Sequence, residues 1–421
     1  MVNHLHPASG PMHRMTSSLR TVPLADTLIK AKAFAAELGV TRVTDTTWLD
    51  CIGVPVYSSI RPDAVPNSLC VNAGKGVHPD EAKVGAYMEA IEFALAEYRN
   101  RSIEVVMSTP GEVMSQKGIE FDFVDLCPIL GRQVDADGPL ACVEAEDIAT
   151  GNRILLPAEL AFSPFSENPG QRIFGTSTNG LSSGNTVAEA TLHGLCEVIE
   201  RDTQSFNFVR DKSRYVHFDH PSENIDILRD RIVGASLQPV LRYTPSRFGI
   251  PYFQGFILES SDEAPIAISQ GAGLHLIRDI AAVRALAEAA QSRLSYIHGG
   301  RDDLIERYDY FANQDGEVER QATSEVRSRI LNESNSIAYS EIASAAPNFS
   351  TIDDALQFLR AKLAEAGIRQ VFRVRLSSET MPLAVVKVIV PKLEHFQPTL
   401  KRVGPRLVDY MDNKGSADEQ V

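Results

Sequence analysis

Polar residues recur at a fixed spacing in the segment GNTVAEATLHGLCEVIERD, residues 184–202. Three glutamates and one histidine stand there at intervals of four, four and three residues, which places their side chains on one side of an α-helix. Two further segments show related spacing, although charged residues at such intervals are also what an ordinary surface helix presents to water. The three polar stripes consist of Glu81, Gly85, Glu89 and Glu92; of Glu189, His193, Glu197 and Glu200; and of Arg284, Glu288 and Gln291.

The carboxylates of these stripes suit a metal ion better than bulk solvent. Glutamates gathered at one site repel one another strongly unless cations neutralise them. Carboxylate oxygens are hard ligands that favour Mg²⁺, which keeps some of its waters and bridges protein carboxylates to substrate phosphates. The first two stripes also form a quasi-repeat, because the pattern EA-x6-E-x-I-E runs from Glu81 to Glu92 and again from Glu189 to Glu200.

A Gly-rich turn precedes each of the first two stripes. Such a turn offers backbone N–H groups, and the helix N-terminus that follows adds a positive dipole end, so both favour phosphate. Lys75 adds a cation, and Ser182 and Asn185 have side chains that cap a helix or bind a ligand. The Walker A pattern is absent, so the stripes predict a nucleotide and metal site that is not a P-loop. Structural interpretations stay open for Lys75 as a surface lysine, His193 as a satisfied helix histidine, Arg284 as a partner of Glu288, Arg201 as a partner of Glu197, and Arg293.

Helical and strand patterns alternate around these segments and predict an α+β fold. Residues 69–100 predict a strand, a turn and a long helix, residues 177–186 a polar turn before the second stripe, and residues 277–300 a third long helix. We expect an N-terminal arm and helix at 1–45, one main domain at 46–400 and a flexible tail at 401–421. Other expected elements are helices at 26–40 and 352–367, short strands within 101–175, strands at 41–47, 51–62, 214–220, 239–246, 251–260, 370–376 and 383–391, and a polar segment at 301–350.

Composition excludes several function classes. The chain has 41 basic and 55 acidic residues and a net charge of −14, which argues against non-specific binding of nucleic acid or anionic membranes. No apolar run approaches the roughly 20 residues that a membrane-spanning helix needs, and the N-terminus lacks the apolar core of a secretory signal. The five cysteines include no C-x-x-C pair, so we expect reduced, mostly buried thiols in a cytoplasmic protein.

The segment from Ser182 to Arg201, with the pattern SxxGNTxxEAxxxGLxEVxER, resembles the second ATP-site motif of the YcaO family. Gly74-Lys75-Gly76 followed by E-x-x-E at Glu89 and Glu92 resembles the first motif, and RALAEAAQSR resembles the third. The similarity extends from about Trp48 to about Pro391. It implies a YcaO-like α+β fold in which mixed or antiparallel sheets and long helices surround a central site for ATP and Mg²⁺.

The resemblance also implies an activity. Members of the family use ATP to activate a peptide-bond carbonyl oxygen, so that a nucleophile adds to the backbone and phosphate leaves. By this resemblance Glu89, Glu92, Glu197 and Glu200 hold the metals, with catalytic roles for Glu89, Glu200 and Arg284. The residues implied to surround the nucleotide are Lys75, Ser182, Asn185, Glu189, His193, Arg201, Arg284 and Glu288.

Several differences from the family motifs help to predict the branch of the family to which the chain is similar. Gly85 stands where many members have Ser, Phe93 where many have Arg, and His193 where many have Gln. The Pro-rich end of azoline-forming members is not seen, which resembles the stand-alone members that work beside a TfuA protein. We therefore expect thioamide formation on a peptide or protein, with a TfuA-like partner, a sulfur source and a homodimer. The alternatives are an azoline-forming or amidine-forming enzyme, a small-molecule ATP-dependent ligase, and a scaffold without turnover.

Overall fold

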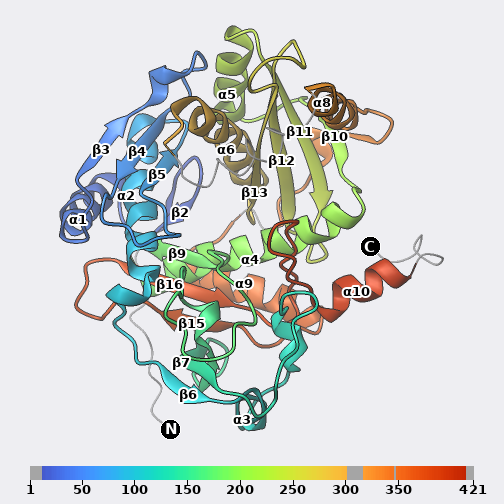
Figure 1. Cartoon of the computed structure of the whole chain (residues 1–421). Coiled ribbons are helices and arrows are strands. Elements are labelled where there is room, and N and C mark those ends of the chain that lie inside the picture. Colours follow the sequence, from blue (N-terminus) through green and yellow to red (C-terminus); the bar gives the residue numbers. More distant parts are fainter. Residues whose placement is uncertain (1–11, 301–315, 346–347, 414–421) are drawn as a thin grey trace.

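The computed structural model describes residues 12–300, 316–345 and 348–413. The first part of the expected arm (1–11) and the end of the expected tail (414–421) lie outside the described residues. The described strands form three main sheets and one short hairpin, with long helices around them (Figure 1). Their pairing is antiparallel except between β10 (Arg214–His217) and β14 (Ser336–Ala338). The α+β class expected from the sequence is confirmed.

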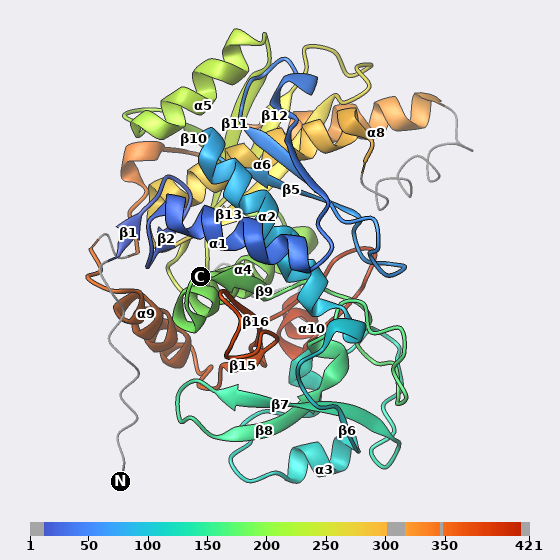
Figure 2. The ribbon, with the colours of Figure 1, turned by 90° about the vertical axis from the view of Figure 1, so that its left-hand side faces the viewer.

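A three-stranded sheet and two helices form the N-terminal layer of the molecule. Its elements are α1 (Leu24–Glu37), β3 (Arg42–Asp45), β4 (Val56–Ile60), β5 (Val71–Lys75) and α2 (Pro79–Ala96). The strand order is β3-β4-β5, α2 packs against β5 and β4, and α1 packs on α2 (Figure 2). A Cβ at Gly74 would stand 2.1 Å from the Ala82 carbonyl oxygen, so the glycine lets α2 lie directly against β5.

A five-stranded sheet in the order β13-β12-β11-β10-β14 forms the second layer. Besides β10 and β14 it includes β11 (Gln238–Pro245), β12 (Pro251–Leu258) and β13 (Ile268–Leu274), with α5 (Glu223–Gly234), α6 (Arg278–His298) and α8 (Gly316–Ile330) beside it. α6 packs along β13 and β12. A Cβ at Gly273 would lie 2.1 Å from the Ala281 carbonyl oxygen, so here too glycine allows the helix to approach its strand.

A six-stranded sheet forms the third layer, with β6-β7-β15-β16-β9 in order and β8 paired with β7. Its strands are β6 (Val106–Ser108), β7 (Leu140–Asp147), β8 (Arg153–Pro157), β9 (Leu181–Gly184), β15 (Phe372–Arg375) and β16 (Ala384–Ile389). The helices of this part are α3 (Pro110–Ser115), α4 (Val187–Val209), α9 (Ile352–Glu365) and α10 (Pro405–Asp412). α4 packs on β9 and β16, and α9 packs on α4.

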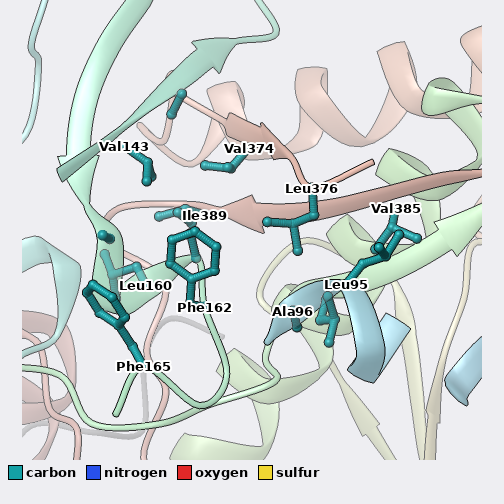
Figure 3. Packing of buried hydrophobic residues seen from close by; sticks show 14 of the residues in the cluster. Leu95, Ala96, Val143, Leu160, Phe162, Phe165, Val374, Leu376, Val385 and Ile389 are labelled. Atoms are coloured by element: carbon teal, nitrogen blue, oxygen red, sulfur yellow. The ribbon is translucent and has the colours of Figure 1, made fainter. Parts of the chain in front are cut away.

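One hydrophobic core ties the C-terminal end of α2 to this third sheet. Leu95 packs in the same buried cluster as Leu160, Phe162, Leu376 and Val385 (Figure 3). Burial of side chains of this size stabilises the fold by roughly 1.5–3 kcal/mol each. This core fixes α2 relative to the sheet on which α4 lies, and α4 packs against that sheet through a second buried cluster.

The structure differs from the sequence prediction in several elements. Residues 181–184, expected in a turn, form β9, because they pair with β16. β13 and α5 were not expected, and α8 lies within the expected polar segment. The expected flexible tail contains α10, in which Leu407 is fully buried and its N–H donates to Glu394 at 2.9 Å.

Two further expectations concern the cysteines and membrane-spanning helices. None of the five cysteines, all of which lie in the described ranges, forms a disulfide; three are buried, Cys70 is half-buried and Cys51 is exposed. Among the helices that the structure describes, none combines the length and the apolar character needed to cross a bilayer.

Candidate active site

The polar stripes of α2, α4 and α6 converge on one cavity of about 420 Å³. Its other walls come from β5 and from the segment that precedes α1. Residues far apart in the sequence therefore share one site, as the matching stripes suggested. The stripe residues that line the cavity are Glu81, Gly85, Glu89, Glu92, His193, Glu197, Glu200, Arg284, Glu288 and Gln291, and Lys75 and Arg201 line it as well.

Strand β5 connects the α2 wall to the α6 wall. Its Ala73 N–H donates to Glu89 Oε2 at 3.3 Å, and Ala73 O accepts from Gln291 Nε2 at 2.6 Å. Lys75, at the end of the same strand, donates to Glu288 Oε2 at 2.8 Å. Burial alone would raise the pKa of Glu288, but the ion pair with Lys75 lowers it below the usual value. These contacts set the α2 and α6 stripes on either side of β5.

Helix α4 forms the third wall of the cavity. The Leu274 N–H of β13 donates to Glu200 Oε2 at 2.9 Å, and Glu200 is 4% exposed. Arg201 Nε lies 4.0 Å from Glu197 Oε1, one helical turn away. Arg201 therefore partly neutralises Glu197 and also lines the cavity, so the two interpretations left open for it are compatible.

Burial raises the pKa of three carboxyl groups around the cavity. It raises the pKa of Glu92 to about 8; the hydrogen bond from Ser183, at 2.5 Å, opposes the shift, and the neighbouring glutamates add to it. Burial also raises the pKa of Glu197 and of Glu200, and Arg201 opposes both shifts. The protein thus supplies too little positive charge to match its own carboxylates, and a bound cation would favour their ionised forms.

Basic and neutral nitrogen groups face the same cavity. Arg284 Nε is buried and has no hydrogen-bond partner among the described residues. Burial, assisted by Arg284 and Arg20, lowers the pKa of His193 well below its usual value, so this imidazole is neutral at pH 7. Lys75, rather than Arg284, forms the ion pair that the structure gives to Glu288. Arg293, which was open to a structural interpretation, lies outside the cavity lining and pairs with Asp50 and Glu259.

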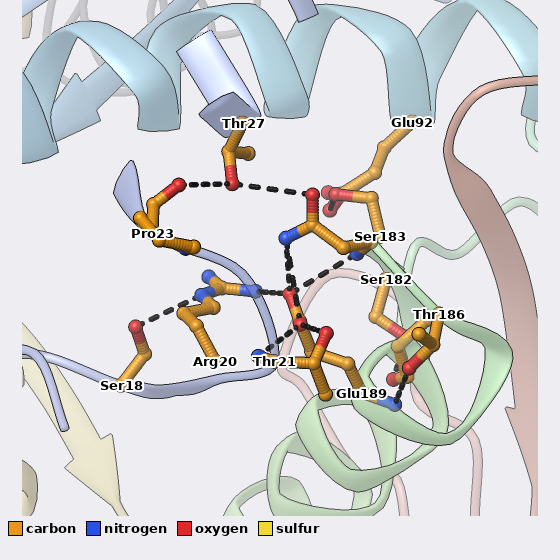
Figure 4. Close-up of polar contacts among 12 residues, drawn as sticks. Ser18, Arg20, Thr21, Pro23, Thr27, Glu92, Ser182, Ser183, Thr186 and Glu189 are labelled. Carbon is orange, nitrogen blue, oxygen red and sulfur yellow. Dashed lines mark hydrogen bonds and ion pairs between the residues drawn. The ribbon is translucent and has the colours of Figure 1, made fainter. Parts of the chain in front are cut away.

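Three residues implied to surround the nucleotide do not line the cavity: Ser182, Asn185 and Glu189. Ser182 Oγ donates to the Ala190 carbonyl oxygen at 2.8 Å. Asn185 donates to Glu189 through both its backbone N–H and its Nδ2. Ser182 lies on β9 and Glu189 in the first turn of α4, and both already form hydrogen bonds within the protein (Figure 4).

The sequence analysis missed part of the cavity wall. Met15, Ser17, Ser18, Arg20 and Leu24 line it, although this stretch was expected to belong to a flexible arm and helix. The stretch has no helical or strand periodicity. Its hydroxyl-rich run TSSLRT could have indicated a contact with the acidic stripes, because hydroxyl groups and arginine donate hydrogen bonds to carboxylates.

The residues present fit a metal-bound polyphosphate better than a resident metal ion. Within the described ranges, no group of three or more His, Cys, Asp or Glu side chains is placed to hold a metal ion by itself. Mg²⁺ commonly takes one or two protein carboxylates and completes its shell with waters and substrate phosphates. The cavity offers carboxylates that would bind the metal ion and a buried donor, Arg284 Nε, that would bind a phosphate oxygen.

Comparison with known proteins bears on the family and the fold of the chain. A family model described as YcaO cyclodehydratase, ATP- and Mg²⁺-binding, matches residues 73–394. An uncharacterized protein of Methanothermobacter thermautotrophicus is 33% identical over 89% of this chain and 96% of its own length. An uncharacterized protein in the tfuA 3′ region of Rhizobium leguminosarum bv. trifolii is 31% identical over 89% and 88%. The structure of YcaO from Methanopyrus kandleri bound with AMPPCP and Mg²⁺ superposes with a TM-score of 0.71 at 22% identity, covering 94% of this chain and 97% of that one.

Proposed function

Because the chain belongs to the YcaO family, whose members bind ATP and Mg²⁺, we propose that it uses both to activate a peptide-bond carbonyl oxygen for backbone modification. The observation that carries this proposal is the convergence of the α2, α4 and α6 stripes on one cavity, with carboxylates and cations interleaved. A scaffold without turnover gains nothing from buried carboxylates that lack matching cations, since their burial costs free energy.

We assign the metal to the paired glutamates of the quasi-repeat. Each pair, Glu89 and Glu92 on α2 and Glu197 and Glu200 on α4, would supply one or two ligands to a Mg²⁺ ion, and waters and ATP phosphates would complete its shell. ATP and Mg²⁺ together supply a phosphoryl group that turns the amide oxygen into a good leaving group, with the metal offsetting the phosphate charge. Among these carboxylates, Glu200 is held in place by the Leu274 N–H, so its orientation is fixed before any ligand arrives.

The nitrogen groups of the cavity are assigned to the nucleotide. Arg284 has a buried donor free for an anionic oxygen, and Arg201 stands beside the metal carboxylates. Lys75 and Glu288 form an ion pair at the β5 side, which presents a cation and keeps its carboxylate ionised. The neutral His193 offers a donor and an acceptor without adding charge.

Within this activity we propose thioamide formation on a peptide or protein, with a TfuA-like partner. The relative in the tfuA 3′ region of Rhizobium supports this branch. The family description as a cyclodehydratase supports the alternative, in which a Cys, Ser or Thr side chain of the substrate closes an azoline ring. The two branches share the activation of the amide oxygen and differ in the nucleophile that adds to the amide carbon.

Product mass separates the two branches. The protein is incubated with ATP, Mg²⁺, sulfide and candidate peptides, with and without the TfuA-like protein, and the peptides are analysed by mass spectrometry. Thioamide formation exchanges one oxygen for sulfur, whereas azoline formation removes one water. ATP consumption that depends on peptide supports the activation step, and ATP consumption with no change of peptide mass would contradict it.

A further inference from the structure

Residues 13–21 form a strap that contacts the first turn of three helices. Its ends pair as a short hairpin, with His13 opposite Arg20 and Arg14 opposite Leu19. Toward α2, the Thr16 N–H donates to Glu81 Oε1 at 3.0 Å, and Thr16 Oγ1 also donates to this carboxylate. Toward α6, Arg14 Nη2 lies 3.9 Å from Asp279 Oδ2.

The contact of the strap with α4 is the most extensive. Glu189 accepts hydrogen bonds from Arg20 Nη1 at 2.9 Å and from both the N–H and the Oγ1 of Thr21 at 2.8 Å (Figure 4). Asn185 donates to the same carboxylate from the helix side. Glu189 is 1% exposed, and although burial opposes the shift, Arg20 and the Thr21 donors lower its pKa below the usual value. An ionised, fully hydrogen-bonded carboxylate therefore anchors the strap.

Two of the residues that hold the strap do not face the cavity. Thr16 and Thr21 supply their hydroxyl groups to helix carboxylates and are not part of the cavity lining. Met15, Ser18 and Arg20, between and beside them, line the cavity. A change of Thr21 thus reaches the cavity only through the strap and its anchor Glu189, which lies outside the lining, whereas a change of Thr16 also alters the surroundings of Glu81, which lines the cavity.

We propose that Thr16, Thr21 and Glu189 are positioning residues that clasp the strap across α2 and α4 and so complete the wall of the nucleotide cavity. This inference rests on the proposed function, because it takes the ligand of the cavity to be ATP. The clasp acts on nucleotide affinity: the strap lines the cavity, whereas the metal carboxylates are held separately by β5 and β13.

The test is a double variant, Thr16→Val with Thr21→Val, which removes both hydroxyl groups and leaves side-chain shape nearly unchanged. Hydrogen bonds to charged groups are among the stronger ones, so we expect the Kd for ATP, with Mg²⁺ present, to rise about tenfold. The turnover number at saturating ATP should change less than about twofold, because the clasp does not touch the reacting atoms. The matched control is Thr41→Val, whose hydroxyl bonds to the Ile60 carbonyl oxygen away from the cavity lining.

The outcomes are distinguishable. An unchanged Kd for ATP in the double variant overturns the clasp, and so does a loss of turnover with the Kd unchanged. If the double variant does not fold, each single variant gives the same readout. The proposed function fails separately, if the wild-type protein shows no peptide-dependent ATP consumption.

A second measurement uses the unmodified protein. Arg14 and Arg20 make the strap a substrate for trypsin, and nucleotide bound against the strap should hold it closed. We expect ATP with Mg²⁺ to slow cleavage after Arg20 several-fold, relative to Mg²⁺ alone. Equal rates of cleavage with and without ATP would overturn the proposal.

Discussion

Buried carboxylates occur in two regions of this molecule, and the regions differ in what surrounds them. In the scaffold, Glu159 accepts the backbone N–H groups of residues 173–175 at distances of 2.7 to 2.8 Å. Glu97, which is fully buried, forms ion pairs with Arg61 at 2.6 Å and with Arg99 at 2.9 Å. In each case the protein itself supplies the donors that burial of a charge requires.

In the cavity the supply of donors is smaller. Within the described part of the chain, Glu200 accepts one hydrogen bond, from Leu274 N, and the nearest cation to Glu197 is 4.0 Å away. Burial raises the pKa of both groups. This difference indicates a ligand site. Burial of a carboxylate without matching donors costs free energy, and a bound cation would offset that cost.

The largest effect should come from breaking a satisfied carboxylate. Glu97→Ala leaves the guanidinium of Arg61, which is 1% exposed, without its counter-charge. We expect the free energy of unfolding to fall by about 3–5 kcal/mol, measured by urea denaturation. The control is Glu144→Ala, which breaks an exposed ion pair with Arg153 and should cost at most about 1 kcal/mol. Equal losses in the two variants would show that the buried Glu97 contributes no more to stability than an exposed ion pair.

Substitution of a cavity carboxylate should reduce activity without reducing stability. Glu200→Gln removes a proposed metal ligand, and we expect ATP turnover with peptide to fall at least about 100-fold. The melting temperature should stay the same or rise, because the amide no longer carries a charge in a poorly neutralised site. Turnover close to that of the wild type would show that this carboxylate is not part of the reaction. Glu144→Gln serves as the surface control.

The pH dependence of stability gives a smaller effect of known sign. The pKa of Glu92 is raised from 4.5 to about 8 in the folded protein. The folded state therefore binds more protons than the unfolded state between these values, and the free energy of unfolding falls as pH rises through this window. Without Mg²⁺, the fall between pH 5.5 and pH 7 should be roughly 2 kcal/mol larger in the wild type than in Glu92→Gln. Parallel curves for the two proteins would contradict the shift.

The smallest effect is expected at His193. Its pKa is lowered well below the usual value by burial, so the side chain is neutral through the pH range in which the enzyme is assayed. Glutamine keeps a neutral donor and acceptor at this position. We expect His193→Gln to change turnover by less than about threefold between pH 6 and pH 8, with no change in the shape of the profile. A shifted limb of the profile would show that the imidazole takes part in proton transfer.

The sequence allowed prediction of those parts of the site that lie on regular helices. The 4-4-3 spacing on α2 and α4 reports which side chains share a face, and the repeat of that spacing indicated that the faces meet. The strap was not predictable in this way. Its contacts with Glu81 and Glu189 join residues 65 to 169 positions apart through a few backbone N–H, hydroxyl and guanidinium groups, which leave no periodic pattern.

Elements of the fold were missed where tertiary packing decides the conformation. β9 consists of Leu-Ser-Ser-Gly, a composition typical of turns, and it is a strand because β16 pairs with it. β13 contains Gly271 and Gly273, which weaken the strand pattern but allow α6 to lie against the sheet. In both strands the small residues serve the close approach of a helix that carries site residues.

The central claim is that the glutamates of α2 and α4 hold a metal together with a nucleotide. A crystal structure with a non-hydrolysable ATP analogue and Mn²⁺, whose anomalous signal locates the metal, tests it most directly. We predict metal density in contact with carboxylates of both helices, among Glu89, Glu92, Glu197 and Glu200, and phosphate oxygens facing Arg284. A metal and an analogue bound elsewhere, with these four carboxylates in contact with water alone, would contradict the account.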